Sequence, residues 1–150
     1  MQLDALMDHG PIVAQEVCPM IWEDENPPRG SVLEDILAHQ GGKLLANVLP
    51  HWKDGKITPI AQDHARATFC RKITKADGHI DLSTDPLLAI RKIRAFDIWP
   101  GTYFFVQHND RDMRIRIAQA HIDDGALIID RVVPEGKNEM GYEDFKRGFK

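Results

Sequence analysis

Three segments in the last third of the chain have the composition of β-strands and are separated by only a few residues. They are rich in β-branched and aromatic side chains and span Thr102–His108, Met113–Ile122 and Ala126–Val133. The polar turn Asn109–Asp112 joins the first two. Asp123-Asp124-Gly125 joins the second and third, and an Asp-Gly pair is a strong hairpin signal. The pattern predicts a β-rich C-terminal part whose consecutive strands are joined by tight turns.

A short helix is predicted directly before the first of these strands. An apolar stripe at helical spacing is formed by Leu87, Ile90 and Ile93. The residues Ser83–Asp85 are of types that cap helix N-termini, and Pro86 suits the first helical turn. The segment Ile93–Gly101 then leads through an aromatic corner into the strand.

Basic residues gather around this helix and corner, beside Phe96 and Trp99. Cations next to flat rings suit a nucleic-acid surface, because the charge neutralises phosphates and rings can stack on bases. We interpret Phe96 and Trp99 themselves as packing residues of the corner rather than as stacking platforms. The candidate contacts to a nucleic-acid backbone are Arg71, Lys72, Lys75, Arg91, Lys92 and Arg94.

A longer helix is predicted in the N-terminal half. Ser31-Val32-Leu33-Glu34 has the capping-box pattern of a helix start, and an apolar face at helical spacing follows. Gly41-Gly42 is either a weak point of this helix or a position of close contact. Short strands are expected over Met1–Met7, Pro11–Val17 and Ala67–Ile73. These are too few to cover the apolar face of residues 32–49, so we interpret the chain as the rear of a longer protein.

The linker is predicted within Pro50–Asp63, where Pro, Gly and polar residues are frequent. The expected organisation is a first domain at residues 1–52, a linker at 53–63 and a second domain at 64–150. A loop is expected at Glu23–Gly30. A single turn capped by Thr74–Asp77 and a last helical turn at Tyr142–Arg147 complete the expected elements.

Composition places the chain among globular proteins, with 43% hydrophobic and 28% charged residues. No apolar run approaches membrane length, so we expect a cytoplasmic protein with no membrane partner. Cys18 and Cys70 are predicted to be reduced buried thiols, and no metal site is expected from the scattered histidines. The net charge of −4 hides a strongly acidic first 40 residues. A polyanionic partner would therefore dock on the mildly basic remainder.

Five segments of the chain carry sequence motifs in a characteristic order. The first is Leu3–Gln15, which contains Asp8-His9-Gly10-Pro11-Ile12. The others are Ser31–Pro50, Ile57–Asp63, Arg71–Lys75 with His79-Ile80-Asp81, and Ile93–Phe96 with Trp99-Pro100-Gly101. Together they resemble the back half of the methionyl-tRNA formyltransferase family.

The resemblance implies an α/β fragment, the end of a Rossmann-like formyltransferase domain, followed by a small, shortened OB-like or open β-barrel domain that binds tRNA. It implies transfer of a formyl group from 10-formyltetrahydrofolate to the amino group of methionyl initiator tRNA in translation initiation, without a metal, by a protein that is monomeric at full length. The family's front half supplies the catalytic Asn and His. The isolated 150 residues are therefore expected to be inactive, and formyl transfer by them would refute this.

The resemblance also assigns roles to residues of the first motif. Asp8 matches the family's catalytic aspartate, whereas its sequence context alone marks only a turn residue. His9 and Gly10 are candidate contacts to the folate. His79 and Asp81 are expected to form a hydrogen-bonded pair with a structural role.

Three other interpretations of the sequence are considered. One is a related formyltransferase that acts on an amino-sugar nucleotide and shares the front loop, although the basic, aromatic second domain argues against it. Another is a tRNA-binding module without catalysis, which predicts affinity for tRNA that falls steeply with salt. The third is a purely structural adaptor, which would bind neither ligand.

Overall fold

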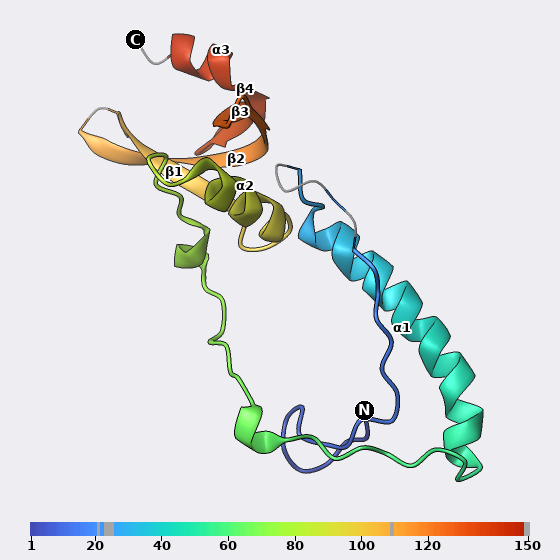
Figure 1. Cartoon of the computed structure of the whole chain (residues 1–150). Helices are drawn as coiled ribbons and strands as arrows, with labels where there is room; N and C mark the ends of the chain where they lie inside the picture. Colours follow the sequence, from blue (N-terminus) through green and yellow to red (C-terminus); the bar gives the residue numbers. More distant parts are fainter. Residues whose placement is uncertain (21, 23–25, 109, 149–150) are drawn as a thin grey trace. The chain divides into compact units, whose positions relative to one another are not determined.

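The structure is a computed structural model that describes residues 1–20, 22, 26–108 and 110–148 (Figure 1). The chain forms two compact units, each considered by itself. The first unit comprises Met1–Met20 and Glu34–Arg71, and the second comprises Ile21–Leu33 and Lys72–Lys150. Glu23, Asp24 and Glu25 of the predicted loop, and Asn109 of the first predicted turn, lie outside the described residues.

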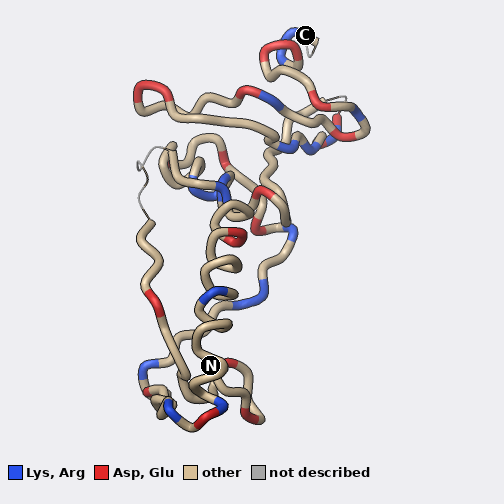
Figure 2. The backbone as a smooth tube through the Cα atoms, turned by 90° about the vertical axis from the view of Figure 1, so that its right-hand side faces the viewer, with Lys and Arg blue, Asp and Glu red and all other residues tan. Residues whose placement is uncertain are grey.

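The second unit contains a four-stranded antiparallel sheet with the strand order β1-β2-β3-β4. The strands are β1 (Thr102–His108), β2 (Arg111–Asp123), β3 (Ala126–Pro134) and β4 (Met140–Gly141). The three strands predicted from sequence are confirmed, and β2 and β3 each extend slightly further. Asp124 and Gly125 both have positive φ, 46° and 72°, as the tight β2–β3 turn requires. Figure 2 shows Lys and Arg positions recurring along α2 (Pro86–Ala95) and the strands.

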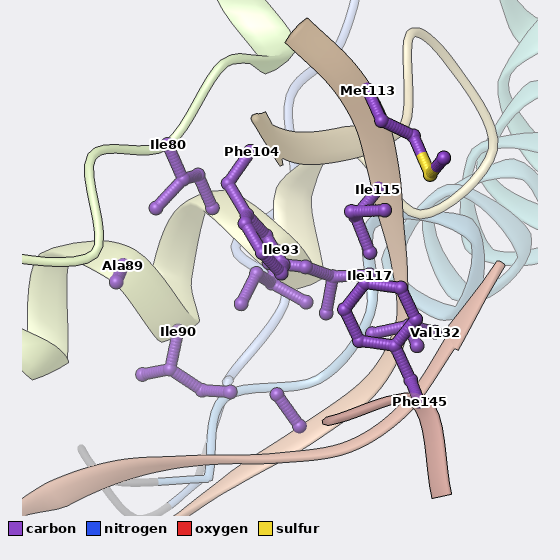
Figure 3. Close-up of a cluster of buried hydrophobic side chains, with 11 residues drawn as sticks. Ile80, Ala89, Ile90, Ile93, Phe104, Met113, Ile115, Ile117, Val132 and Phe145 are labelled. Carbon is purple, nitrogen blue, oxygen red and sulfur yellow. The ribbon is translucent and has the colours of Figure 1, made fainter. Parts of the chain in front are cut away.

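The helix α2 and the last helix α3 (Tyr142–Arg147) supply the other side of the core. Ile90, Ile115 and Val132 are 0% exposed, which places a helix and two strands in one cluster. Figure 3 shows Phe145 of α3 beside Val132 in the same cluster. The remaining buried members are Ile80, Ala89, Ile93, Phe104, Met113, Ile117 and Ala120. The apolar stripe of the predicted helix therefore forms one wall of the core.

Asp85 begins α2 by accepting a hydrogen bond from the backbone N–H of Leu88 at 3.0 Å. We expect Asp85→Ala to lower the free energy of unfolding by about 1 kcal/mol, because one N–H of the first turn loses its acceptor. Asp85→Ser should retain most of this stability, since a hydroxyl also caps. Urea denaturation followed by circular dichroism measures the difference. Equal losses in the two variants would contradict a capping role.

The first turn of α1 (Gly30–Lys53) belongs to the second unit and departs from the predicted capping box. The backbone N–H of Ser31 donates to Asp97 Oδ1 at 3.2 Å, and the Ser31 hydroxyl donates to Asp97 Oδ2. The acceptor thus comes from the corner after α2, which the local sequence does not reveal. A Cβ at Gly30 would lie 2.8 Å from the Ala95 carbonyl oxygen, so glycine allows this close approach.

The helices of the first unit are residues 34–53 of α1 and the short 3-10 helix η1 (His64–Arg66). The strands predicted at Met1–Met7, Pro11–Val17 and Ala67–Ile73 are wrong for the described residues. Only an isolated bridge between Ile12 and Ile60 forms there. The apolar runs have no neighbouring strand to complete a ladder, and a strand without a paired partner is not stable.

The long helix also differs in extent from the prediction. α1 continues through Gly41-Gly42, where a Cβ would meet nothing within 4 Å, and it includes Pro50. The glycines therefore mark no close contact within the described structure. None of the α1 side chains is buried. No helix among the described residues is long and apolar enough to cross a membrane.

Candidate active-site turn and nucleic-acid interface

The turn that carries Asp8 is held by a side chain from a distant part of the first unit. Gln62 Nε2 donates to the carbonyl oxygens of Asp8, at 2.9 Å, and of Gly10, at 2.7 Å. Asp8 has φ 55°, a left-handed conformation that Asp tolerates better than most residues. Gly10 is buried, and a Cβ there would overlap the Gln2 carbonyl oxygen. The turn is thus fixed while the Asp8 side chain remains exposed.

His9 is oriented by two contacts within the same unit. Its Nδ1 hydrogen-bonds Asp4 Oδ2 at 2.6 Å, and its ring stacks on His64 with centroids 3.7 Å apart and planes 3° from parallel. Asp4 also accepts from the backbone N–H of Leu6. The hydrogen bond from His9, and then that from Leu6, hold the pKa of Asp4 below its ordinary value of 3.8. No other described residue hydrogen-bonds His9 Nε2.

We expect the ionised Asp4 carboxylate to stabilise this turn at neutral pH. Because its folded-state pKa is lowered, the stabilisation is fully present above pH 3.8 and is lost as pH falls through the folded-state pKa. In His9→Ala the pKa of Asp4 should rise toward 3.8, because the larger cause of the shift is removed. The pKa of Asp81, lowered by hydrogen bonds from Ser83, serves as the control. An NMR acid titration of the carboxyl carbons that gave an unchanged Asp4 pKa would contradict the expectation.

The predicted pair between His79 and Asp81 is not formed. Asp81 Oδ1 instead accepts from the backbone N–H and the hydroxyl of Ser83, at 2.9 and 2.7 Å. A serine two residues away is nearer to the carboxylate and offers two donors in a local turn. The predicted turn at Thr74–Asp77 is confirmed as the 3-10 helix η2 (Lys75–Gly78), with reciprocal Thr74 and Asp77 contacts.

The six predicted phosphate-contacting residues lie in both units, and they differ in exposure and in hydrogen-bond partners. Arg71 belongs to the first unit, whereas the other five belong to the second. Lys75 and Arg91 are exposed. Lys92 Nζ donates to the His79 carbonyl oxygen at 2.6 Å, and Arg94 Nη2 donates to Asn26 Oδ1 at 3.2 Å. Lys92 therefore links α2 to the segment around His79 by a hydrogen bond.

The outer face of the sheet brings aromatic rings and arginines together in the second unit. Tyr103 lies opposite Arg116 in the β1–β2 register, and Phe105 lies opposite Arg114. The Arg114 guanidinium carbon is 5.4 Å from the Tyr103 ring centroid. The ring of His79 lies 5.6 Å from both aromatic rings. We name these five residues the aromatic–arginine face.

Sequence reasoning did not select this face, although a signal was present. In β1, Tyr103 and Phe105 alternate with the buried Thr102 and Phe104 and the partly buried Val106. In β2, Arg114 and Arg116 alternate with the buried Met113, Ile115 and Ile117. Period-two alternation in paired strands places both outward sets on one face. Phe105 is 48% exposed and Trp99 is 50% exposed, so Trp99 is not the buried packing residue predicted for the corner.

Neither a metal cluster nor a disulfide is found among the residues that the structure describes. Within the described ranges no group of three His, Cys, Asp or Glu side chains is placed to hold a metal ion. Cys18 is half-buried and Cys70 is exposed, and both are free. The prediction that both thiols are buried is therefore wrong for Cys70, and Cys18 is only partly buried.

Comparison with known proteins identifies the relatives of the chain. Residues 72–125 match the family model described as the formyl transferase C-terminal domain. The methionyl-tRNA formyltransferase of Herpetosiphon aurantiacus is 35% identical over 99% of this chain and 54% of its own length. That of Chloroflexus aurantiacus is 38% identical over 95% of this chain and 43% of its own length. The chain is a homologue of methionyl-tRNA formyltransferase.

The formyltransferase homologue spans about half the length of the curated relatives it matches. A solved structure of methionyl-tRNA formyltransferase from Clostridium thermocellum matches with a TM-score of 0.59 and 17% identity, over 88% of this chain and 52% of that chain. At this identity the match supports the fold alone. The region that matches the C-terminal domain model contains α2, β1 and β2, and all five residues of the aromatic–arginine face.

Proposed function

We propose that this chain provides the C-terminal portion of a methionyl-tRNA formyltransferase and that its second unit binds the tRNA. The observation that carries the proposal is the aromatic–arginine face, because it combines stacking surfaces with cations on a rigid sheet. Rings exposed on strands can stack on unpaired bases, and neighbouring arginines can neutralise phosphates. The homology to methionyl-tRNA formyltransferases supports initiator methionyl-tRNA as the nucleic acid.

The reaction is transfer of a formyl group from 10-formyltetrahydrofolate to the amino group of methionine on the tRNA. Attack by the amine on the formyl carbon forms a tetrahedral oxyanion. The oxyanion collapses as the bond from the formyl carbon to the folate nitrogen breaks and tetrahydrofolate leaves, and the attacking nitrogen loses a proton. Asp8 is the proposed catalytic carboxylate, supported by its place on a turn that Gln62 fixes and by its exposed side chain. His9 and Gly10 are the proposed contacts to the folate co-substrate.

The same proposal covers the finer architecture. Residues 1–52 would be the end of a Rossmann-like domain, residues 53–63 a linker and residues 64–150 a shortened OB-like or open-barrel domain. The exposed apolar side chains of α1, including Leu37, Leu45 and Leu49, support the first assignment, because they need a covering layer. We also propose that the protein is cytoplasmic and monomeric and that it uses no metal cofactor.

The binding of tRNA is tested by measuring the affinity at a series of salt concentrations. The chain should bind methionyl initiator tRNA with log K falling linearly against log salt concentration, with a slope of about −0.7 to −0.9 per phosphate contact. Fluorescence anisotropy with labelled tRNA measures this, and an amino-sugar nucleotide is the competitor. Displacement of the tRNA by the nucleotide sugar, or absence of tRNA binding at low salt, would contradict the proposal.

Catalysis by Asp8 is tested separately, with a formyl-transfer assay on the natural protein that contains these residues. Asp8→Asn should lower formyl transfer by about 10²- to 10⁴-fold while tRNA affinity is retained, because a proton-handling group is lost. Asp54→Asn is the matched control, since Asp54 is an exposed carboxylate of the same unit that pairs with Lys56. Full activity of Asp8→Asn would leave the non-catalytic tRNA-binding module as the better interpretation.

A further inference from the structure

A cavity of about 240 Å³ lies in the second unit, at the corner between α2 and β1. Three arginines line it, and each comes from a different part of the unit: Arg29 precedes α1, Arg94 lies near the end of α2, and Arg116 is on β2. The register of β2 and β3 shifts between Ile117 and Ala120 at one wall of the cavity. A bulge of this kind re-aims side chains and is frequent next to functional sites.

Arg94 has a donor that nothing in the described structure uses. Its Nε is buried and has no hydrogen-bond partner, while Nη2 donates to Asn26 Oδ1. Buried polar groups are almost always paired, so an unpaired guanidinium donor beside a cavity indicates a ligand or water that completes it. The Arg116 side chain passes next to Gly101, with its Cδ 3.6 Å from where a Cβ of that glycine would be.

Two carboxylates also line the cavity, and both are engaged. Asp97 accepts from the backbone N–H and the hydroxyl of Ser31. Glu139 is ion-paired with Arg131 Nε. Among the described residues no carboxylate pairs with Arg29 or Arg116. The cavity lining therefore retains a net positive charge.

We propose that this cavity binds one phosphate group through Arg29, Arg94 and Arg116. Guanidinium groups are planar forks that hydrogen-bond phosphate oxygens in pairs, and three of them from different parts of the unit can share the oxygens of one tetrahedral anion. Binding provides the missing acceptor for Arg94 Nε. In the proposed tRNA-binding function, on which this step rests, the cavity holds one backbone phosphate beside the aromatic–arginine face.

The direct test is a titration of the isotope-labelled 150-residue chain with inorganic phosphate, followed through the Arg94 Nε–H NMR signal. We expect a saturable shift that matched concentrations of chloride do not produce. Arg29→Gln and Arg116→Gln should each weaken phosphate binding by about tenfold, the effect of losing one charge-assisted hydrogen bond. Both residues are exposed, so these variants should fold. Arg111→Gln, which removes an exposed arginine at the other end of β2, should leave the phosphate affinity unchanged.

A second titration with methionyl initiator tRNA separates this inference from the proposed function. Arg94→Gln should reduce the slope of log K against log salt concentration by about the amount of one phosphate contact, whereas Arg111→Gln should leave the slope unchanged. If inorganic phosphate binds and tRNA does not, the phosphate site stands and the proposed function fails. If tRNA binds equally well to the three cavity variants, and the Arg94 signal shifts no further in phosphate than in chloride, the phosphate site is overturned.

Discussion

Ile90→Ala is expected to destabilise the second unit by about 2–5 kcal/mol, the largest effect on stability that we anticipate for a single truncation. Ile90 is 0% exposed and packs from α2 into the cluster shown in Figure 3. Its truncation removes buried methyl groups and leaves a cavity. The packed helix and sheet can relax only partly to fill this cavity. The free energy of unfolding is measured by urea denaturation with circular dichroism.

The matched control is Leu88→Ala on the same helix. Leu88 is 58% exposed, so its truncation should change the free energy of unfolding by no more than about 0.5 kcal/mol. Both variants make the same kind of change to helix propensity, and the difference between them reports burial. Similar losses in Ile90→Ala and Leu88→Ala would mean that α2 does not pack on the sheet through the face described.

Phe105→Ala is expected to have the largest effect of a single aromatic truncation on tRNA binding. Loss of one stacked base costs about 1–3 kcal/mol, which corresponds to a roughly 5- to 150-fold weaker affinity. Phe105 is half-exposed and lies outside the core, so the variant should remain folded. Fluorescence anisotropy with labelled methionyl initiator tRNA at one fixed salt concentration measures the change.

Two further variants distinguish stacking from general loss of surface. Ile128→Ala removes a partly exposed apolar side chain from β3 of the same sheet, and tRNA affinity should be unchanged. Arg114→Gln should weaken binding and reduce the salt slope by about one contact, because it removes a cation beside the Tyr103 ring. If Phe105→Ala and Ile128→Ala bind tRNA equally well, bases do not stack on this face.

The sequence predicts most of the second unit because its local signals and its packing agree. Asp85 and Pro86 start α2 as their residue types suggest, and the Asp124-Gly125 turn has the backbone conformation that its sequence favours. The strands have neighbours a few residues away in the chain. Local propensity, turn chemistry and pairing therefore lead to the same structure.

The first unit was predicted less well because its apolar segments lack partners. Pro11–Val17 has the composition of a strand, but only Ile12 bridges another segment. α1 extends past Pro50, with the Asp54 N–H still donating to the Pro50 carbonyl oxygen. A strand depends on a neighbour that composition cannot supply, whereas a helix forms its own hydrogen bonds.

In the candidate sites, too, the features set by neighbouring residues could be predicted, and those set by distant residues could not. The turn at Asp8 follows from its Asp-His-Gly sequence. Gln62, which fixes that turn, and His64, which stacks on His9, lie more than 50 residues away and carry no local signal. The convergence of Arg29, Arg94 and Arg116 on one cavity likewise appears only in three dimensions.

Contact between the outer face of the sheet and tRNA is tested most directly by mapping the contact surface by NMR. The aromatic and arginine side-chain signals of the 150-residue chain are recorded with and without methionyl initiator tRNA. We expect the largest changes at Tyr103, Phe105 and Arg114, and we expect these changes to diminish as salt is raised. Binding that leaves these three signals unchanged while shifting signals elsewhere would contradict it.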